Sequence, residues 1–179
     1  GYAGVVLVDE AYADFGPANC MALATAPDNE NLLVMRTLSK SFSLAGLRFG
    51  YCVGPEPLIE ALYKIKDSYN MDALAQVIGA AALEDLPHMR ANVAKVQATR
   101  TRLTAALEGR GWRVLPSSTN FLFARPPEPA KAADLFAALR DRHIFLRYFP
   151  GPRTGEWIRI TVGSDAEVDT LLAALDTLA

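Results

Sequence analysis

One lysine of this 179-residue chain lies among small hydroxyl residues, with an arginine a short distance beyond it. The lysine is Lys40, the hydroxyl residues are Thr37 and Ser39, and the arginine is Arg48. A primary amine forms an imine with a carbonyl compound when burial or a neighbouring cation keeps it unprotonated. A guanidinium fork together with hydroxyl groups suits a phosphate. The segment therefore predicts an imine-forming lysine beside a phosphate site.

An aspartate and a tyrosine further upstream extend this set. Asp9 ends a short apolar run, and Tyr12 follows three residues later. A carboxylate can pair with a pyridinium N–H, and a tyrosine hydroxyl can bond a phenolate oxygen beside an imine. Pyridoxal 5'-phosphate (PLP) requires these groups: an amine, an acid for its ring nitrogen and side chains that bind its phosphate. Each residue also has a simpler interpretation: Lys40 as a surface lysine, Asp9 as a turn cap and Tyr12 as a half-buried aromatic. Their joint spacing favours the cofactor site.

The elements that must position these residues are strands of an α/β sheet. Apolar runs at 5–8, 32–35 and 49–53 predict three strands. The first run is continuous and β-branched, which is typical of a buried parallel strand with neighbours on both sides. Such a beginning resembles the middle of a domain, and we expect the chain to be a fragment of a longer protein.

The rest of the chain alternates helical and strand patterns. Helices are predicted at 56–66, from an N-cap at Asp72 to 83, from Pro87 to about 108, at 131–140 and at 166–178. Strands are predicted at 112–115, 121–124 and 157–162. We expect a second α/β unit with its own sheet after a boundary near residue 80, inside or just before the long helix.

Composition excludes several classes of protein. The net charge is −2, so there is no general attraction to nucleic acid or to an anionic membrane. Cys20 and Cys52 are the only cysteines and form no CxxC motif, which favours a reduced, cytoplasmic protein without a metal site. No apolar run reaches the length of a membrane span.

The order of three motifs resembles the fold-type I PLP-dependent aminotransferases, and most of all the histidinol-phosphate aminotransferases among them. The motifs are Asp-Glu-Ala-Tyr at 9–12, Arg-Thr-Leu-Ser-Lys at 36–40 and Ala-Gly-Leu-Arg-Phe-Gly-Tyr at 45–51. The resemblance covers the whole chain, as roughly the C-terminal half of such an enzyme. It implies the end of the large PLP-binding domain in residues 1–80 and the small C-terminal α/β domain in residues 81–179.

The resemblance also implies roles for the cofactor residues. Lys40 would bind PLP as an imine and later move a proton between substrate and cofactor. Asp9 would pair with the pyridine nitrogen, and Tyr12 would bond the cofactor O3′. The remaining implied cofactor residues hold the phosphate, and they are Thr37, Ser39 and Arg48.

Three residues nearer the C-terminus match substrate-binding positions of the family. Arg159 and Arg147 match arginines that bind the anionic group of the substrate, and Asn120 would shape the same pocket. Without the resemblance, both arginines read as strand-edge charges, and a strand-end hydrogen bond explains Asn120 equally well.

The activity that the resemblance implies is amino transfer. A homodimer would move an amino group between glutamate or 2-oxoglutarate and a keto compound, by ping-pong kinetics. The expected pair is histidinol phosphate and imidazole acetol phosphate, of histidine biosynthesis. The alternatives are an aromatic or other amino acid aminotransferase, a phosphothreonine-type decarboxylase and a non-catalytic aminotransferase-like sensing domain. The fragment alone is expected to be inactive.

Overall fold

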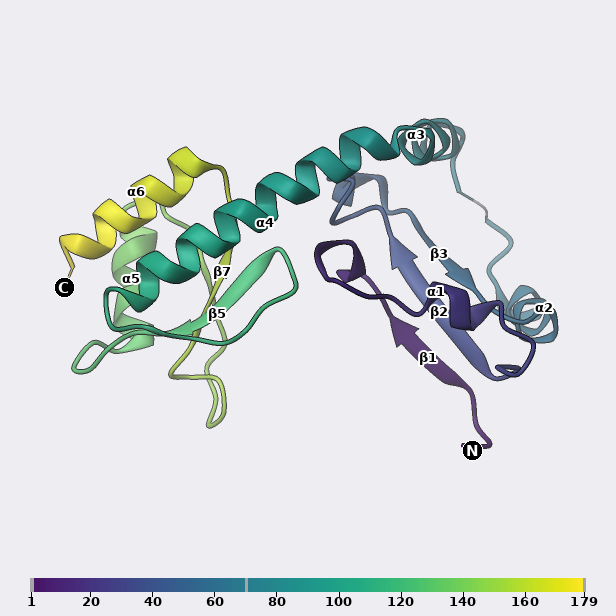
Figure 1. Cartoon of the computed structure of the whole chain (residues 1–179), viewed down its shortest axis with the longest axis horizontal. Coiled ribbons are helices and arrows are strands. Elements are labelled where there is room, and N and C mark those ends of the chain that lie inside the picture. Colours follow the sequence, from purple (N-terminus) through teal and green to yellow (C-terminus); the bar gives the residue numbers. More distant parts are fainter. Residues whose placement is uncertain (1, 70, 179) are drawn as a thin grey trace. The chain divides into compact units, whose positions relative to one another are not determined.

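The structure is a computed structural model that describes residues 2–69 and 71–178 (Figure 1). The chain forms two compact units, Gly1–Val93 and Ala94–Ala179. The division falls within helix α4 (Leu86–Glu108); we expected it near residue 80, inside or just before the long helix. The assignment of residues 1–80 and 81–179 to a large and a small domain stays a prediction.

The first unit is built on a three-stranded mixed sheet in the order β1-β2-β3. The strands are β1 (Val6–Asp9), β2 (Leu32–Thr37) and β3 (Gly50–Val53). β1 runs parallel to β2, and β3 runs antiparallel to β2. The three predicted strands are thus present, each within about two residues of its predicted range.

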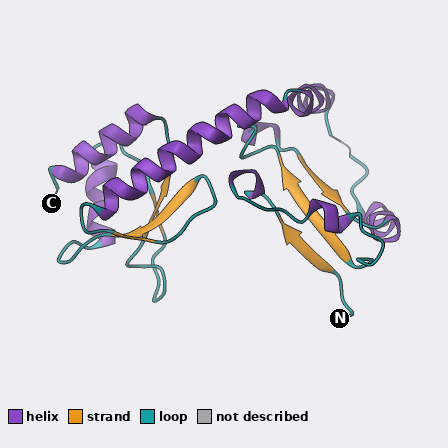
Figure 2. Ribbon diagram, viewed as in Figure 1, coloured by secondary structure: helices purple, strands orange, loops and turns teal. Residues whose placement is uncertain are grey.

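Short helical segments connect these strands, and longer helices follow them (Figure 2). The segments are η1 (Ala13–Phe15), α1 (Met21–Ala24) and η2 (Ala45–Leu47). Helix α2 (Glu56–Ile65) begins with a proline at its second position, and α3 (Ala73–Glu84) follows. The predicted N-cap is confirmed, because the Asp72 carboxylate accepts a hydrogen bond from the Ala75 N–H at 2.9 Å.

The first strand differs from the prediction of a buried strand with two neighbours. β1 lies at the edge of the sheet and pairs only with β2 among the described residues. Val5 and Leu7 expose 54% and 53% of their surface. The prediction of a parallel strand was right, and the prediction of burial was wrong for this chain, because a run of apolar residues does not by itself supply a second neighbour.

The second unit packs three helices against one face of an antiparallel sheet (Figure 1). The sheet order is β4-β5-β7-β6, from β4 (Arg113–Val114), β5 (Phe121–Arg125), β6 (Arg147–Tyr148) and β7 (Ile158–Thr161). The helices are the C-terminal part of α4, α5 (Ala132–Asp141) and α6 (Asp165–Asp176). Strand β6 is too short to have given a recognisable pattern in the sequence.

Side chains alternate across this second sheet. Leu122 and Ala124 of β5 and Ile158 and Ile160 of β7 are buried in the core with leucines of all three helices. The intervening residues of both strands lie on the opposite face, since successive side chains of a strand point to opposite sides. Helix α6 begins with a capping box between Ser164 and Glu167.

No helix within residues 2–69 and 71–178 is both long enough and apolar enough to cross a membrane.

Candidate functional site

Three of the predicted cofactor residues lie at the edge of the first unit's sheet where the parallel strands β1 and β2 end. Asp9 ends β1 and Thr37 ends β2, and because these strands are parallel their carboxyl ends lie at the same edge. Thr37 is paired with Gly50, the first residue of the antiparallel β3. Arg48 precedes Gly50 by two residues and so reaches the same edge. Ligands of open α/β sheets bind at the carboxyl ends of parallel strands.

Lys40 lies on the loop that leaves this edge. Its Nζ is 5.4 Å from the centroid of the Tyr12 ring, which brings together two residues that the sequence separates by 28 positions (40 − 12). Leu38 anchors the loop, because it is fully buried and its N–H donates to the Phe49 carbonyl at 3.0 Å. The Leu44 N–H closes the loop on the Leu38 carbonyl at 3.0 Å.

The hydroxyls at this edge are ordered by local hydrogen bonds. Thr37 Oγ1 accepts from the Ser39 N–H at 3.0 Å, and it lies 2.9 Å from Ser39 Oγ and 3.1 Å from the Phe49 carbonyl oxygen. Asp9 Oδ1 accepts from the Ala11 N–H at 3.0 Å. Asp9 therefore does act as a turn cap, and its second carboxylate oxygen has no hydrogen bond with any described residue.

Arg48 adopts a left-handed backbone conformation, with φ 56° and ψ 34°. A non-glycine residue in this region is held there by its surroundings at a cost of order 1 kcal/mol. Its Nη1 donates to the Ala45 carbonyl at 3.0 Å, and its other N–H groups are unpaired within the described part of the chain. The side chain is exposed at the sheet edge, as an anion-binding arginine would be.

Beneath this edge lies a buried network that the sequence analysis did not identify. We call Glu10, Asp14, Arg36 and Ser41 the buried network. Arg36 donates from Nε and Nη2 to Glu10 at 2.9 and 2.7 Å, and from Nη1 to Asp14 at 2.8 Å. Ser41 Oγ donates to the other oxygen of Asp14 at 2.5 Å, and the Cys20 N–H donates to Glu10. The available signal was Arg36 at the end of an apolar strand, because a buried charge must be paired.

A phenol beside the network is affected mainly by its own burial. Burial raises the pKa of Tyr51, and the nearby acids Asp14 and Glu10 act in the same direction, while the Arg36 charge opposes them. Tyr51 is paired with Arg36 across β2 and β3. It is therefore a neutral hydrogen-bonding group at neutral pH.

The predicted substrate residues lie in the second unit, on the sheet face opposite the core. Arg147 of β6 and Arg159 of β7 are directly paired across the two strands. The Phe149 ring centroid lies 5.2 Å from Arg147 Cζ and 5.8 Å from Arg159 Cζ, and Phe121 lies 5.0 Å from Arg159. Neither guanidinium forms an ion pair or a hydrogen bond with any described residue, and Arg159 Nε is a buried donor without an acceptor. Like charges in register repel, so this arrangement suits a shared anion.

Asn120 immediately precedes β5. Its backbone carbonyl accepts from the Val162 N–H at 2.9 Å, which is the strand-end role considered above. Its side-chain amide has no hydrogen bond to residues 2–69 or 71–178.

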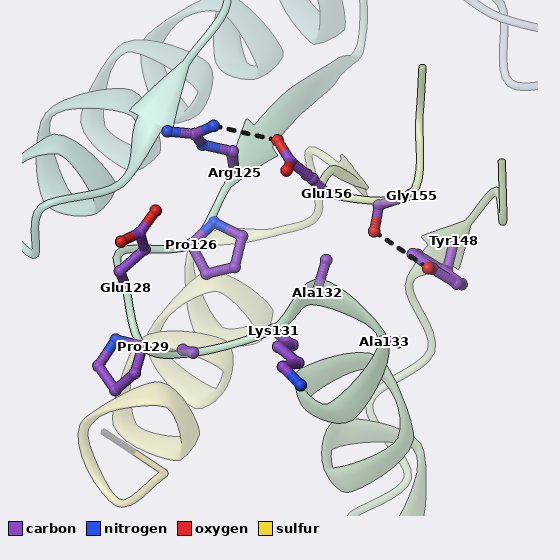
Figure 3. A pocket seen from close by; sticks show the side chains of 11 residues that line it. Arg125, Pro126, Glu128, Pro129, Lys131, Ala132, Ala133, Tyr148, Gly155 and Glu156 are labelled. Carbon is purple, nitrogen blue, oxygen red and sulfur yellow. Dashed lines mark hydrogen bonds and ion pairs between the residues drawn. The ribbon is translucent and has the colours of Figure 1, made fainter. Parts of the chain in front are cut away.

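A pocket of about 600 Å³ in the second unit is lined by none of the predicted site residues (Figure 3). Arg125 pairs with Glu156 at 3.0 Å on one wall, and Tyr148 donates to the Gly155 carbonyl at 3.0 Å. Lys131 and Glu128 complete a balanced set of charges. Within the described ranges no three His, Cys, Asp or Glu residues are grouped to hold a metal ion.

The chain belongs to the aminotransferase class I and II family, whose sequence model matches residues 1–175. Its fold is α/β and matches solved aminotransferase structures. It is 50% identical over 177 residues to histidinol-phosphate aminotransferase of Gluconacetobacter diazotrophicus, covering 97% of this chain and 49% of that protein. It is 49% identical over 174 residues to histidinol-phosphate aminotransferase 2 of Rhizobium meliloti, which covers 96% of this chain and 49% of that protein.

A solved structure shows the same likeness. The histidinol-phosphate aminotransferase of Sinorhizobium meliloti, in complex with pyridoxal-5'-phosphate, is 29% identical with a TM-score of 0.82, over 98% of this chain and 50% of that chain. The chain spans about half the length of the curated relatives it matches. That it corresponds to their C-terminal half stays a prediction.

Proposed function

We propose that this chain carries the imine-forming and phosphate-binding part of a PLP-dependent aminotransferase site. The observation that carries the proposal is the meeting of Asp9, Thr37, Lys40 and Arg48 at one edge of the first sheet, with Lys40 over the Tyr12 ring. These groups fit PLP, because an amine, a carboxylate with a free oxygen and an exposed guanidinium match its carbonyl, ring nitrogen and phosphate.

Each residue then has a definite task. PLP, when bound, supplies an electron sink for the negative charge that develops at the substrate Cα. Lys40 would hold the group through its carbonyl carbon and would move the proton at the substrate Cα. Asp9 would pair with the ring nitrogen, Tyr12 would donate to the ring oxygen, and the phosphate would be held by Thr37, Ser39 and Arg48.

The substrate class follows from the two arginines of the second unit. Arg147 and Arg159 present adjacent guanidiniums that no acid among the described residues neutralises, and an anion of charge −2 balances both. A phosphate ester meets this requirement better than one carboxylate does. We therefore propose imidazole acetol phosphate as the keto acceptor and glutamate as the amino donor. The similarity of the chain to a protein named histidinol-phosphate aminotransferase supports a phosphorylated substrate. A cytoplasmic homodimer is part of the same proposal.

The test is amino transfer by the complete protein, supplied with PLP, from glutamate to imidazole acetol phosphate. Lys40→Ala is expected to lower turnover by about 10²-fold to 10⁴-fold, because the proton-transfer group is lost. Lys64→Ala, an exposed lysine of α2, is the matched control and is expected to keep full activity. Full activity of Lys40→Ala would contradict the proposal.

Comparing keto acceptors distinguishes the proposed activity from its alternatives. Faster turnover of an aromatic keto acid than of imidazole acetol phosphate would assign the site to an amino acid aminotransferase. PLP binding without turnover of any amino donor would assign it to a sensing domain.

A further inference from the structure

The buried network is interleaved in sequence with the predicted cofactor residues. Glu10 follows Asp9, and Arg36 precedes Thr37. Ser41 follows Lys40. Arg36 and Thr37 both belong to β2, so their side chains point to opposite sides of the strand. Glu10 and Ser41 lie just beyond the ends of β1 and β2, and both are buried.

Ser41 connects the lysine loop to this network. It exposes only 4% of its surface, and its hydroxyl donates to Asp14 Oδ2 at 2.5 Å. The other Asp14 oxygen is held by Arg36 at 2.8 Å, and Arg36 is in turn fixed by Glu10. The acceptor of the Ser41 hydroxyl is therefore itself immobilised by a charge-assisted pair.

The bonds of Leu38 and Leu44 fix the two ends of the loop, whereas few bonds hold the turn that carries Lys40. Ser43 has a left-handed φ of 59° and is exposed, and the backbone bond from the Ser43 N–H to the Lys40 carbonyl spans only a single turn. A reactive side chain is precise only when neighbouring groups lock its backbone and rotamer.

We propose that Ser41 is a positioning residue for Lys40. Its hydroxyl, held by Asp14, fixes the loop and so sets the direction in which the Lys40 side chain leaves it. The proposal rests on the proposed function, because it takes Lys40 as the imine-forming lysine. It assigns Ser41 no contact with substrate or cofactor.

The experiment compares Ser41→Ala with wild type in the complete protein. Ser43→Ala is the matched control, because it removes a hydroxyl from the same loop that makes no hydrogen bond with the described residues. The first readout is amide hydrogen exchange of residues 38–44. The second is labelling of lysines by PLP with borohydride trapping, in which Lys64 and Lys95 serve as internal references.

Ser41→Ala is expected to speed exchange in residues 38–44 by roughly tenfold, as follows from losing one buried hydrogen bond to a charged group. The ratio of Lys40 labelling to reference labelling is expected to fall several-fold, with the reference rates unchanged. Ser43→Ala is expected to change neither readout. Asp14→Asn, which alters the acceptor and keeps the hydroxyl, is expected to lower the labelling ratio in the same direction.

An unchanged labelling ratio in Ser41→Ala would overturn the proposal, and so would a parallel change at every lysine, which reports only on stability. Failure of the proposed function is seen separately, as wild-type Lys40 that is labelled no faster than the reference lysines. Exchange in residues 38–44 tests the Ser41 tether in either case, because it needs no cofactor.

Discussion

The two units differ in what surrounds the guanidinium of a strand arginine. In the first unit Arg36 is bound by two carboxylates, with 14% of its side chain exposed. In the second unit Arg159 contacts the rings of Phe121 and Phe149 and has no acid partner in the described ranges. Each nitrogen of the Arg36 guanidinium donates to a carboxylate, whereas no described residue accepts a hydrogen bond from Arg159.

This difference separates structural charge from charge available to a ligand. A paired guanidinium holds loops together and has little left for an anion, because its N–H groups are occupied. An aromatic ring attracts a guanidinium through its face and leaves the in-plane N–H groups free. Aromatic contacts therefore hold Arg159 in place while its donors remain open to a substrate.

The largest expected effect is that of Arg36→Ala. It leaves Glu10 buried without its partner, which is expected to cost about 3–5 kcal/mol of unfolding free energy. Amide exchange of β1 and β2 measures this loss in the first unit. A cost below about 1 kcal/mol would contradict the structural role given to Arg36.

A smaller effect is expected at the start of α6. Ser164→Ala removes the N-cap and is expected to cost about 1 kcal/mol. Both tryptophans, Trp112 and Trp157, lie in the second unit, so their fluorescence during urea unfolding reports on it. A variant as stable as wild type would show that the capping box does not stabilise α6.

The same cap predicts a pH dependence. Hydrogen bonds from Ser164 lower the pKa of Glu167 below its unfolded value. The stabilisation is therefore complete above the unfolded pKa and is lost as pH falls through the lower folded pKa. Wild type and Ser164→Ala are both expected to lose stability at acidic pH, because the variant keeps the Ser164 backbone N–H, which lowers the pKa of Glu167 most. The difference between them is expected to narrow by the smaller contribution of the hydroxyl, and a difference that widens as pH falls would contradict this assignment.

A still smaller effect is expected from Arg125→Gln. The Arg125–Glu156 pair is exposed, with 38% and 74% of the side chains accessible, so its loss is expected to change stability by at most about 1 kcal/mol. The effect is expected to shrink further at high salt. Tryptophan fluorescence in urea at two salt concentrations provides the measurement.

The smallest effect on stability is expected from Arg159→Gln, although this substitution is expected to weaken phosphate binding strongly. Loss of the ring contacts is offset by removal of a buried donor without an acceptor, so the unfolding free energy is expected to change within about 0.5 kcal/mol. Binding of inorganic phosphate to the chain, followed by the NMR signals of arginine Nε–H groups, is expected to weaken at least tenfold. Unchanged phosphate binding would remove Arg159 from the proposed substrate site.

The sequence by itself determined the local elements and the order of the chemical groups. Strand patterns, the Asp72 cap and the long helix from Pro87 depend on neighbouring residues, so periodicity and cap chemistry were sufficient to predict them. The motif around Lys40 was recognisable because its residue types follow one another within a single loop.

Only the tertiary structure decided which distant groups meet. Asp14 and Arg36 are separated by 22 residues and pair because parallel β1 and β2 bring their ends together. Arg147 and Arg159 became neighbours through the register of β6 and β7, and the exposure of β1 followed from its place at the sheet edge. These features depend on strand pairing between segments far apart in the chain, which local patterns do not specify.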